Sequence, residues 1–178
     1  VETGTNRVIG AEALVRWRSP MHGLVAPASF IEIAEEAGLI AHIGEWVLMQ
    51  ACRQQRAWQE AGLPSIQMAV NVSSMQFRED HLLTAVVTAV KQTGIDPKLL
   101  QLEVTENLFM KNMNAARNTL ECIRGLGATV AIDDFGTGYS SFSYLRQLPV
   151  DSVKIDRSFV QDLGTKADDR EITRAIVN

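Results

Sequence analysis

Large aliphatic residues recur at every second position in several short segments of the chain, and this alternation predicts β-strands. Segments with apolar residues at helical spacing separate the strands, and most of these end at a glycine. Strands that alternate with helices in this way are typical of βαβ units and a parallel sheet. We expect strands at 7–17, 67–72, 100–105, 129–134 and 152–155, and helices at 27–37, 40–61, 81–92, 115–126, 142–148 and from 168 onward.

The two faces of each expected strand carry different residues. In 67–72, Met68, Val70 and Val72 lie on one face, whereas Asn71 and small residues lie on the other. The later strands repeat this pattern. An open doubly wound sheet has helices on both faces and favours apolar residues on both. A closed barrel has helices outside and polar groups converging at the carboxyl ends of its strands. The asymmetry therefore predicts an α/β fold, a closed (β/α) barrel.

Composition and charge exclude several classes of protein. A chain of 178 residues suffices for one domain with a sizeable core. Its net charge of −4 offers no electrostatic footprint for long nucleic acid. Cys52 and Cys122 form no CxxC pair, which favours reduced thiols over a disulfide framework or a zinc site. No apolar run approaches the length of a membrane span. We expect a cytoplasmic protein, or the cytoplasmic domain of a membrane-anchored one.

One expected strand, at 129–134, ends in the adjacent carboxylates Asp133 and Asp134, and a glycine-rich loop follows. Two such carboxylates repel each other unless a positive group lies between them, and a divalent metal ion meets that need. The other strands would add polar groups at the same end of a barrel. The resulting oxygen-rich set suits one or two Mg²⁺ or Mn²⁺ ions. Its ligands would be Glu12, Asn71, Glu103, Asp133 and Asp134, with Lys154 among them.

Such a set can cleave a phosphodiester. Two metal ions spaced by a phosphoryl group generate hydroxide and stabilise the charge that develops during cleavage. Lys154 would orient or deprotonate the attacking water, or neutralise charge. Arg16, on the same strand face as Glu12 and Leu14, would pair with a substrate phosphate, and Leu14 is a second candidate for substrate contact. Each residue taken singly also has a purely structural interpretation, but their joint occurrence at strand ends favours a site.

These residues also carry a resemblance to a known family. Residues 12–17 (Glu-Ala-Leu-Val-Arg-Trp) resemble the signature of the EAL domain family, the bacterial cyclic di-GMP phosphodiesterases. The match continues in the family's order through 71–73, 103–106, 133–141 and 154–156, and it covers essentially the whole chain. The resemblance implies a modified TIM barrel. It also implies metal ligation by Glu12, Asn71, Glu103, Asp133 and Asp134, catalytic support from Lys154, phosphate contact by Arg16, and a steadying of the Asp-Phe-Gly loop by Glu106.

The activity that the resemblance implies is metal-dependent hydrolysis of cyclic di-GMP to linear pGpG. Mg²⁺ or Mn²⁺ would support turnover, and Ca²⁺ would inhibit it. A homodimer formed near the Asp-Phe-Gly loop is expected, as is fusion to sensor or diguanylate cyclase (GGDEF-type) domains.

The ends of the chain depart from the family pattern. The family's opening strand, with a Tyr-Gln-Pro-like segment, has no counterpart here, and neither do its closing segments with Ala-Glu-Gly-Val-Glu-like and Gln-Gly motifs. We therefore interpret 1–178 as a partial EAL phosphodiesterase domain, an incomplete barrel that lacks the first strand and the last strands. We expect the complete domain to be active and this fragment alone to be inactive.

Three other interpretations compete with the phosphodiesterase. A non-catalytic cyclic di-GMP receptor or signalling module is the main alternative, and the glutamate of the missing closing segment would distinguish the two. A protein kinase is rejected although 134–136 reads Asp-Phe-Gly, because no Gly-rich loop or His-Arg-Asp motif precedes it. A purely structural domain, with its polar strand ends satisfied by buried water, is the third.

Overall fold

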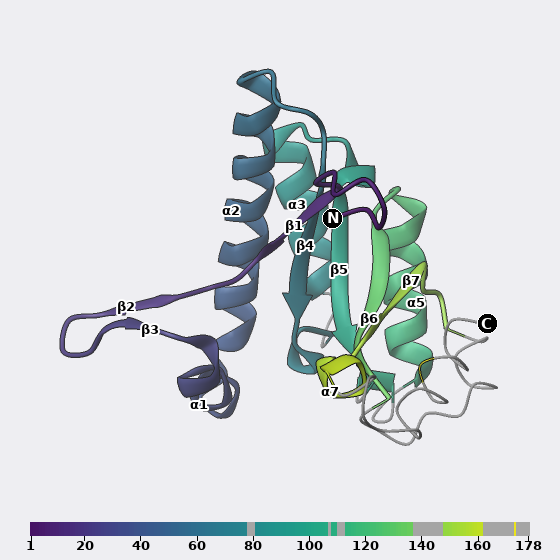
Figure 1. Cartoon of the computed structure of the whole chain (residues 1–178). Coiled ribbons are helices and arrows are strands. Elements are labelled where there is room, and N and C mark those ends of the chain that lie inside the picture. The colour runs from purple at the N-terminus through teal and green to yellow at the C-terminus, as the bar shows by residue number, and fades with distance from the viewer. Residues whose placement is uncertain (78–80, 107, 110–112, 137–147, 162–172, 174–178) are drawn as a thin grey trace.

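Five parallel strands form the centre of the computed structural model, which describes residues 1–77, 81–106, 108–109, 113–136, 148–161 and 173. The strands run in the order β1-β4-β5-β6-β7, and every neighbouring pair is parallel. Their bounds are β1 (Gly10–Ala13), β4 (Gln67–Val72), β5 (Leu100–Thr105), β6 (Thr129–Phe135) and β7 (Ser152–Ile155). Figure 1 shows the sheet curving across the molecule, with β1 and β7 at its two edges.

Helices cover one face of this sheet (Figure 1). The long ones are α2 (Ile40–Glu60), α3 (His81–Thr93) and α5 (Met113–Gly125). The core lies between these helices and the sheet. It contains the aliphatic side chains on one face of each strand, such as Val70, Leu102 and Val130. Asn71 and Asp133, which have the other parity, are not part of this core. The predicted difference between the two strand faces is therefore confirmed, and it leaves the polar residues on the face that the helices do not cover.

The predicted strand 7–17 is wrong in its extent. β1 ends at Ala13, its last residue paired with β4, and the chain then leaves the sheet. β2 (Trp17–Ser19) pairs instead with β3 (Gly23–Val25) as an antiparallel hairpin. Apolar and polar residues alternate along the whole stretch, so the pattern alone did not reveal the break between two separate sheets. In Figure 1 this hairpin projects away from the parallel sheet.

The remaining predicted elements agree with the structure to within a few residues. The expected helix 27–37 divides at Phe30, whose φ of −139° is not helical, into a 3-10 turn (Pro27–Ser29) and α1 (Ile31–Glu36). Gly38 (φ +71°) and Gly94 (φ +67°) follow α1 and α3 in the left-handed region, as expected for glycines that end helices.

Besides β3, three short elements were not predicted, namely the 3-10 turns Ser74–Phe77 and Pro97–Leu99 and the helix α7 (Arg157–Gln161). The expected helices at 142–148 and from 168 onward lie almost wholly outside the described residues. None of the described helices is both long enough and apolar enough to cross a membrane.

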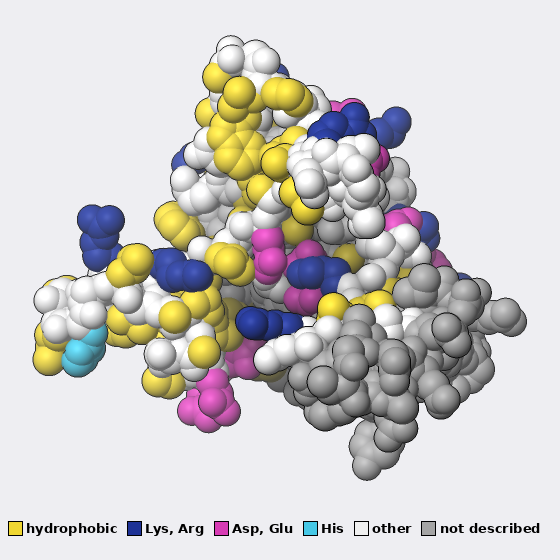
Figure 2. Space-filling model, viewed as in Figure 1, with side chains coloured by type: hydrophobic (Ala, Val, Ile, Leu, Met, Phe, Trp, Pro, Cys, Tyr) yellow, Lys and Arg dark blue, Asp and Glu magenta, His cyan; other side chains and the backbone are white. Residues whose placement is uncertain are grey.

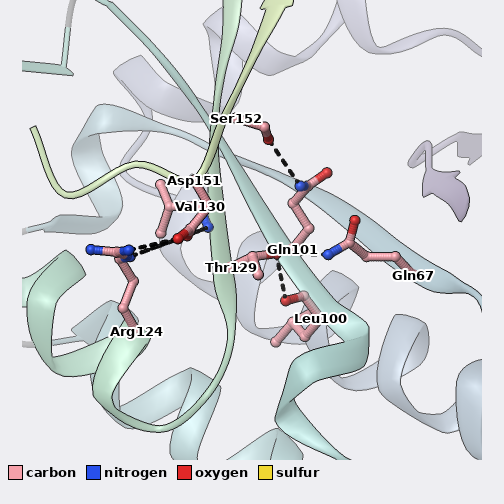
Figure 3. Close-up of polar contacts among 8 residues, drawn as sticks. All are labelled: Gln67, Leu100, Gln101, Arg124, Thr129, Val130, Asp151 and Ser152. Carbon is pink, nitrogen blue, oxygen red and sulfur yellow. Dashed lines mark hydrogen bonds and ion pairs between the residues drawn. The ribbon is translucent and has the colours of Figure 1, made fainter. Parts of the chain in front are cut away.

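A polar layer closes the amino-terminal ends of the strands (Figure 3). Gln67 Nε2 donates to Thr129 Oγ1 at 2.8 Å, and Gln101 Nε2 donates to Ser152 Oγ at 3.3 Å. These bonds join β4 to β6 and β5 to β7, across the strand that lies between each pair. Hydrogen bonds thus tie the amino ends of the sheet together at the opposite end from the predicted site.

Candidate functional site

The strand register brings the predicted site residues to one end of the sheet. Asn71 of β4 lies directly beside Glu103 of β5. Asp133 of β6 pairs with Thr105, two residues further along β5. Because parallel strands all present their carboxyl ends at the same edge, residues from distant parts of the chain meet there. Figure 2 shows acidic and basic side chains side by side near the middle of one face of the molecule.

Lys154 is the centre of this cluster. Its ammonium donates to Glu103 Oε2 at 2.7 Å. It lies 3.2 Å from Asp133 Oδ1 and 3.6 Å from Glu12 Oε2. Four strands therefore contribute one charged side chain each, and within the described part of the chain the Lys154 cation faces three carboxylates.

A second contact joins the first two strands of the cluster. Asn71 Nδ2 donates to Glu12 Oε1 at 2.6 Å. Glu12 therefore accepts from Asn71 through one oxygen and faces Lys154 through the other. This fixes the orientation of its carboxylate, which is about one third exposed and could not hold one position unaided.

Burial and charge shift the protonation of the cluster. The side chain of Glu103 is only 2% exposed, and this burial raises its pKa, although the bond and charge of Lys154 act against the rise. Partial burial opposes the charged form of Lys154, yet its bonds to Glu103 and Asp133 raise the lysine's pKa overall. In this metal-free arrangement Lys154 therefore keeps its proton at neutral pH.

Asp134 differs from Asp133 in its surroundings. Its φ of +52° places it in the left-handed region, so the backbone turns sharply after Asp133. Partial burial and the charges of Asp133 and Asp156 raise the pKa of Asp134. The turn directs the two adjacent carboxylates differently, and only Asp133 joins the Lys154 ion pairs among the described residues.

Glu106 lies where the resemblance implied, next to the loop after β6. Its Oε1 accepts a hydrogen bond from the backbone N–H of Gly136 at 3.3 Å. Gly136 has φ +100°, and a Cβ built on it would lie 2.7 Å from the ring of Phe159 in α7. Glu106 and Phe159 therefore hold this turn from two sides, and only glycine fits between them.

Arg16 and Leu14 lie outside the ion cluster. The described hydrogen bond of Arg16 goes from Nη1 to the carbonyl oxygen of Val15 at 2.8 Å, and Leu14 is 54% exposed. Arg16 instead borders an apolar groove of about 560 Å³ between the hairpin, α1 and the start of α2. Trp17 and Phe30 meet edge to face in this region, with ring centroids 6.1 Å apart.

The donor types of the cluster fit a hard divalent cation. Carboxylate and amide oxygens are the ligands that Mg²⁺ and Mn²⁺ prefer. Among the described residues no three acidic, histidine or cysteine side chains converge closely enough to hold an ion. The ammonium of Lys154 lies among those carboxylates, so a metal ion there would require Lys154 to withdraw from at least one of them.

Sequence reasoning missed one set of contacts near the site. Ser73 follows β4 and donates from Oγ to Oε1 of Glu35 in α1 at 2.5 Å. Gln76 is 4% exposed, and its Oε1 accepts from the N–H of Ser73 at 3.0 Å. Glu35 and Ser73 are 38 positions apart, so no local sequence signal predicts such a bond. Only the arrangement of α1 against the carboxyl end of β4 reveals it.

Fold and site together define a parallel α/β barrel sheet with an acidic, lysine-centred cluster at the carboxyl ends of its strands. The family model of the EAL domain matches residues 1–178. The chain belongs to the EAL domain family, which confirms the resemblance carried by the sequence motifs.

Similar proteins agree with this family. The chain is 46% identical over 170 residues to MucR of Pseudomonas aeruginosa, named a bifunctional diguanylate cyclase/cyclic di-GMP phosphodiesterase, covering 96% of this chain and 25% of MucR. It is 45% identical over 166 residues to the cyclic di-GMP phosphodiesterase NbdA of the same organism, covering 93% of this chain and 21% of NbdA. The chain thus spans about a quarter or less of the length of these curated relatives.

A solved structure supports the fold. The structure of the PaMucR phosphodiesterase in complex with c-di-GMP matches with a TM-score of 0.88 at 46% identity, over 95% of this chain and 68% of that one. This likeness confirms the predicted α/β barrel, of which the described residues form five adjoining parallel strands.

Proposed function

We propose that this chain carries the catalytic face of a phosphodiesterase domain that hydrolyses cyclic di-GMP to linear pGpG with a divalent metal ion. The observation that carries the proposal is the meeting of Glu12, Glu103 and Asp133, from three strands, around Lys154. Membership of the EAL family and similarity to the phosphodiesterases MucR and NbdA support it.

In this proposal Glu12, Asn71, Glu103, Asp133 and Asp134 hold Mg²⁺ or Mn²⁺, and Ca²⁺ inhibits. A bound ion would supply Lewis acidity, which would activate water at neutral pH and stabilise negative charge on the phosphodiester. Asn71 keeps the Glu12 carboxylate oriented. Glu106 holds the turn at Gly136, and with it the end of β6 that carries Asp133 and Asp134.

Lys154 and Arg16 have separate tasks in the proposal. Lys154 holds its proton and presents a positive charge to the substrate phosphate or to the attacking water. Arg16 and Leu14 bind cyclic di-GMP from the side of the hairpin, outside the ion cluster.

We further propose that the chain is part of a larger EAL domain, completed by a first strand and by last strands. β1 is an edge of the described sheet, and Trp46 beside it is 58% exposed. A groove of about 380 Å³ follows the junction of β1 and α2 between Trp46 and Trp58. Edge strands and apolar grooves of this kind are normally covered. The full-length protein would be a cytoplasmic homodimer fused to sensor or GGDEF-type domains.

A non-catalytic cyclic di-GMP receptor is the second candidate. Arg16 and Leu14 lie apart from the ion cluster, so ligand contact on the hairpin side does not require the carboxylates. The PaMucR phosphodiesterase, which shares this fold, was solved as a complex with c-di-GMP.

The deciding experiment measures cyclic di-GMP hydrolysis and binding with Mg²⁺ and with Ca²⁺, on this chain and on the full-length protein. We expect turnover by the full-length protein with Mg²⁺, suppression by Ca²⁺, and none by residues 1–178 alone. The matched variant Asp133→Asn should abolish turnover and leave the unfolding transition near wild type, because an amide is isosteric but uncharged. Tight binding without turnover by the wild-type full-length protein would make it a receptor. Full activity of Asp133→Asn would exclude the metal assignment.

A further inference from the structure

The carboxyl end of β4 carries Asn71, and the helices α1 and α2 both contact the chain immediately after it. Ser73 Oγ donates to Glu35 Oε1 of α1 at 2.5 Å, and the same Oγ accepts from the N–H of Met75 at 3.2 Å. The N–H of Ser73 donates to Gln76 Oε1 at 3.0 Å. Three hydrogen bonds therefore converge on one serine two residues beyond Asn71.

The contact from α2 is made by Gly44 against Gln76. Gln76 packs so closely on Gly44 that a Cβ added to Gly44 would lie 2.0 Å from Gln76 Nε2. Gln76 is also buried, so its amide cannot swing aside into solvent. Gln76 thereby holds the Ser73 N–H from the α2 side, and Glu35 holds the Ser73 hydroxyl from the α1 side. The hydroxyl also accepts from the N–H of Met75, and without Glu35 it would lose the acceptor of its proton.

We propose that Glu35 is a positioning residue for the catalytic cluster, acting through Ser73 on Asn71 and thus on Glu12. This inference rests on the proposed function for its consequence in catalysis. Asn71 donates to Glu12, and Glu12 faces Lys154, so a displacement of the β4 end passes directly into the cluster. A residue that orients a ligand in this way typically changes metal affinity or activity by about 10- to 100-fold when removed.

Glu35 also connects the two sides of the site. Its neighbours Ala34 and Ala37 line the apolar groove that Arg16 borders. The Glu35–Ser73 bond is therefore a direct side-chain link between the α1 wall of that groove and the strand that carries Asn71.

The test uses the full-length protein with Glu35→Ala, Glu35→Gln, Ser73→Ala and the double variant Glu35→Ala/Ser73→Ala. Glu36→Ala is the matched control, because Glu36 is the next residue of α1 and is exposed. We expect Glu35→Ala to lower kcat about tenfold or more, with a smaller change in KM, and to weaken Mn²⁺ binding measured calorimetrically without substrate. Glu35→Gln keeps an acceptor oxygen and should restore activity to within about threefold of wild type.

The double variant separates positioning from general stability. If Glu35 acts through Ser73, the double variant should lower kcat and Mn²⁺ affinity no further than either single alanine variant does. Additive losses, an unchanged Mn²⁺ affinity with Glu35→Ala, or an equal loss with Glu36→Ala would each overturn the inference. If the wild-type protein shows no turnover, the proposed function fails, while the Mn²⁺ affinities of the same variants still decide whether Glu35 and Ser73 are coupled.

Discussion

At the scale of single residues, the cluster is organised by one ammonium group in a partly buried, acidic setting. Glu103 is nearly inaccessible, whereas Lys154 and Glu12 are each more than one third exposed. The ion pair with Glu103 is therefore the part that water screens least. Removing Lys154 leaves a buried carboxylate beside the like charges of Glu12 and Asp133.

The first prediction concerns Lys154→Met and its pH dependence. In metal-free buffer at pH 7 this variant should lose about 1–3 kcal/mol of unfolding free energy, because Glu103 would remain charged, buried and unpaired. Since burial raises the folded pKa of Glu103, its protonated form favours folding. The variant should therefore recover this unfolding free energy below the ordinary glutamate pKa near 4.3. It should lose the free energy again as the pH rises through the pKa of Glu103 in the folded protein.

Urea unfolding at pH 4 and at pH 8 measures this effect. Lys98→Met is the control, since Lys98 is an exposed lysine and its removal leaves no buried carboxylate without a partner. A Lys154→Met loss that is equal at both pH values would show that Glu103 is not the group responsible.

The two cysteines give a second prediction at this scale. Cys52 is fully buried in the core between α2 and the sheet, and burial raises the pKa of its thiol to about 11. Cys122 is exposed. A thiolate-selective reagent at pH 8 should therefore label one thiol rapidly and the second only on unfolding. Cys122→Ser should remove the rapid phase, and rapid labelling of that variant would contradict the burial of Cys52.

At the scale of elements, the sequence predicted best where one physical signal acted alone. β4, β5 and β7 have the expected bounds, because aliphatic residues alternate there and helices bury a single face of each strand. The hairpin was missed because alternation continues from β1 into β2 although the partner strand changes from β4 to β3. Alternating side chains indicate an extended strand, but they do not indicate with which other strand it pairs.

The candidate site shows the same division. Side-chain parity placed Asn71, Glu103 and Asp133 on one face, and the register then set them beside one another. The distances to Lys154 depend on how β7 joins β6 across a register shift between Ile132 and Phe135, and strand parity carries no information on such a shift. The Glu35–Ser73 bond depends on how α1 packs, for which the sequence holds no periodic signal.

The third prediction tests the contact between α2 and the turn after β4. Gly44→Ala should destabilise the protein by about 1–3 kcal/mol, because the new methyl group would displace the buried amide of Gln76 and break its bond to Ser73. Gly125→Ala, at the end of α5 with open space around it, should instead be neutral or stabilise by up to about 1 kcal/mol. Thermal unfolding of the two variants provides the comparison, and a stabilised Gly44→Ala protein would contradict the described packing.

At the scale of the whole molecule, the parallel sheet separates stability from chemistry. Helices and core lie on one face, hydrogen-bonded polar groups join the amino ends of the strands, and the charged cluster lies at the carboxyl ends. β7 contributes Lys154 to the cluster, yet within the described residues it is an edge strand paired only with β6. Its position therefore depends strongly on contacts at its amino end.

Asp151 makes several contacts there (Figure 3). It lies just before β7, and its Oδ1 and Oδ2 accept from Arg124 of α5 at 2.6–3.1 Å. Its Oδ2 also accepts from the N–H of Val130 in β6 at 2.8 Å. One carboxylate thus ties β7 to its neighbouring strand and to the helix behind it.

The final prediction is that Asp151→Ala destabilises the fold by about 1–3 kcal/mol and displaces Lys154, because the Val130 N–H and the Arg124 guanidinium lose a shared acceptor. Partial burial opposes the charged form of Asp151, but the bonds from Arg124 and Val130 lower its pKa overall. The stabilisation that Asp151 gives to the folded protein should therefore be present above the ordinary aspartate pKa near 3.9. It should be lost as the pH falls through the lower pKa of Asp151 in the folded protein. Arg117→Ala, which removes only an exposed helical pair with Glu121, should cost less than about 0.5 kcal/mol. Urea unfolding at pH 7 and pH 2.5 gives both comparisons, and an Asp151→Ala loss no larger at pH 7 than at pH 2.5 would show that the charged carboxylate does not hold β7 in place.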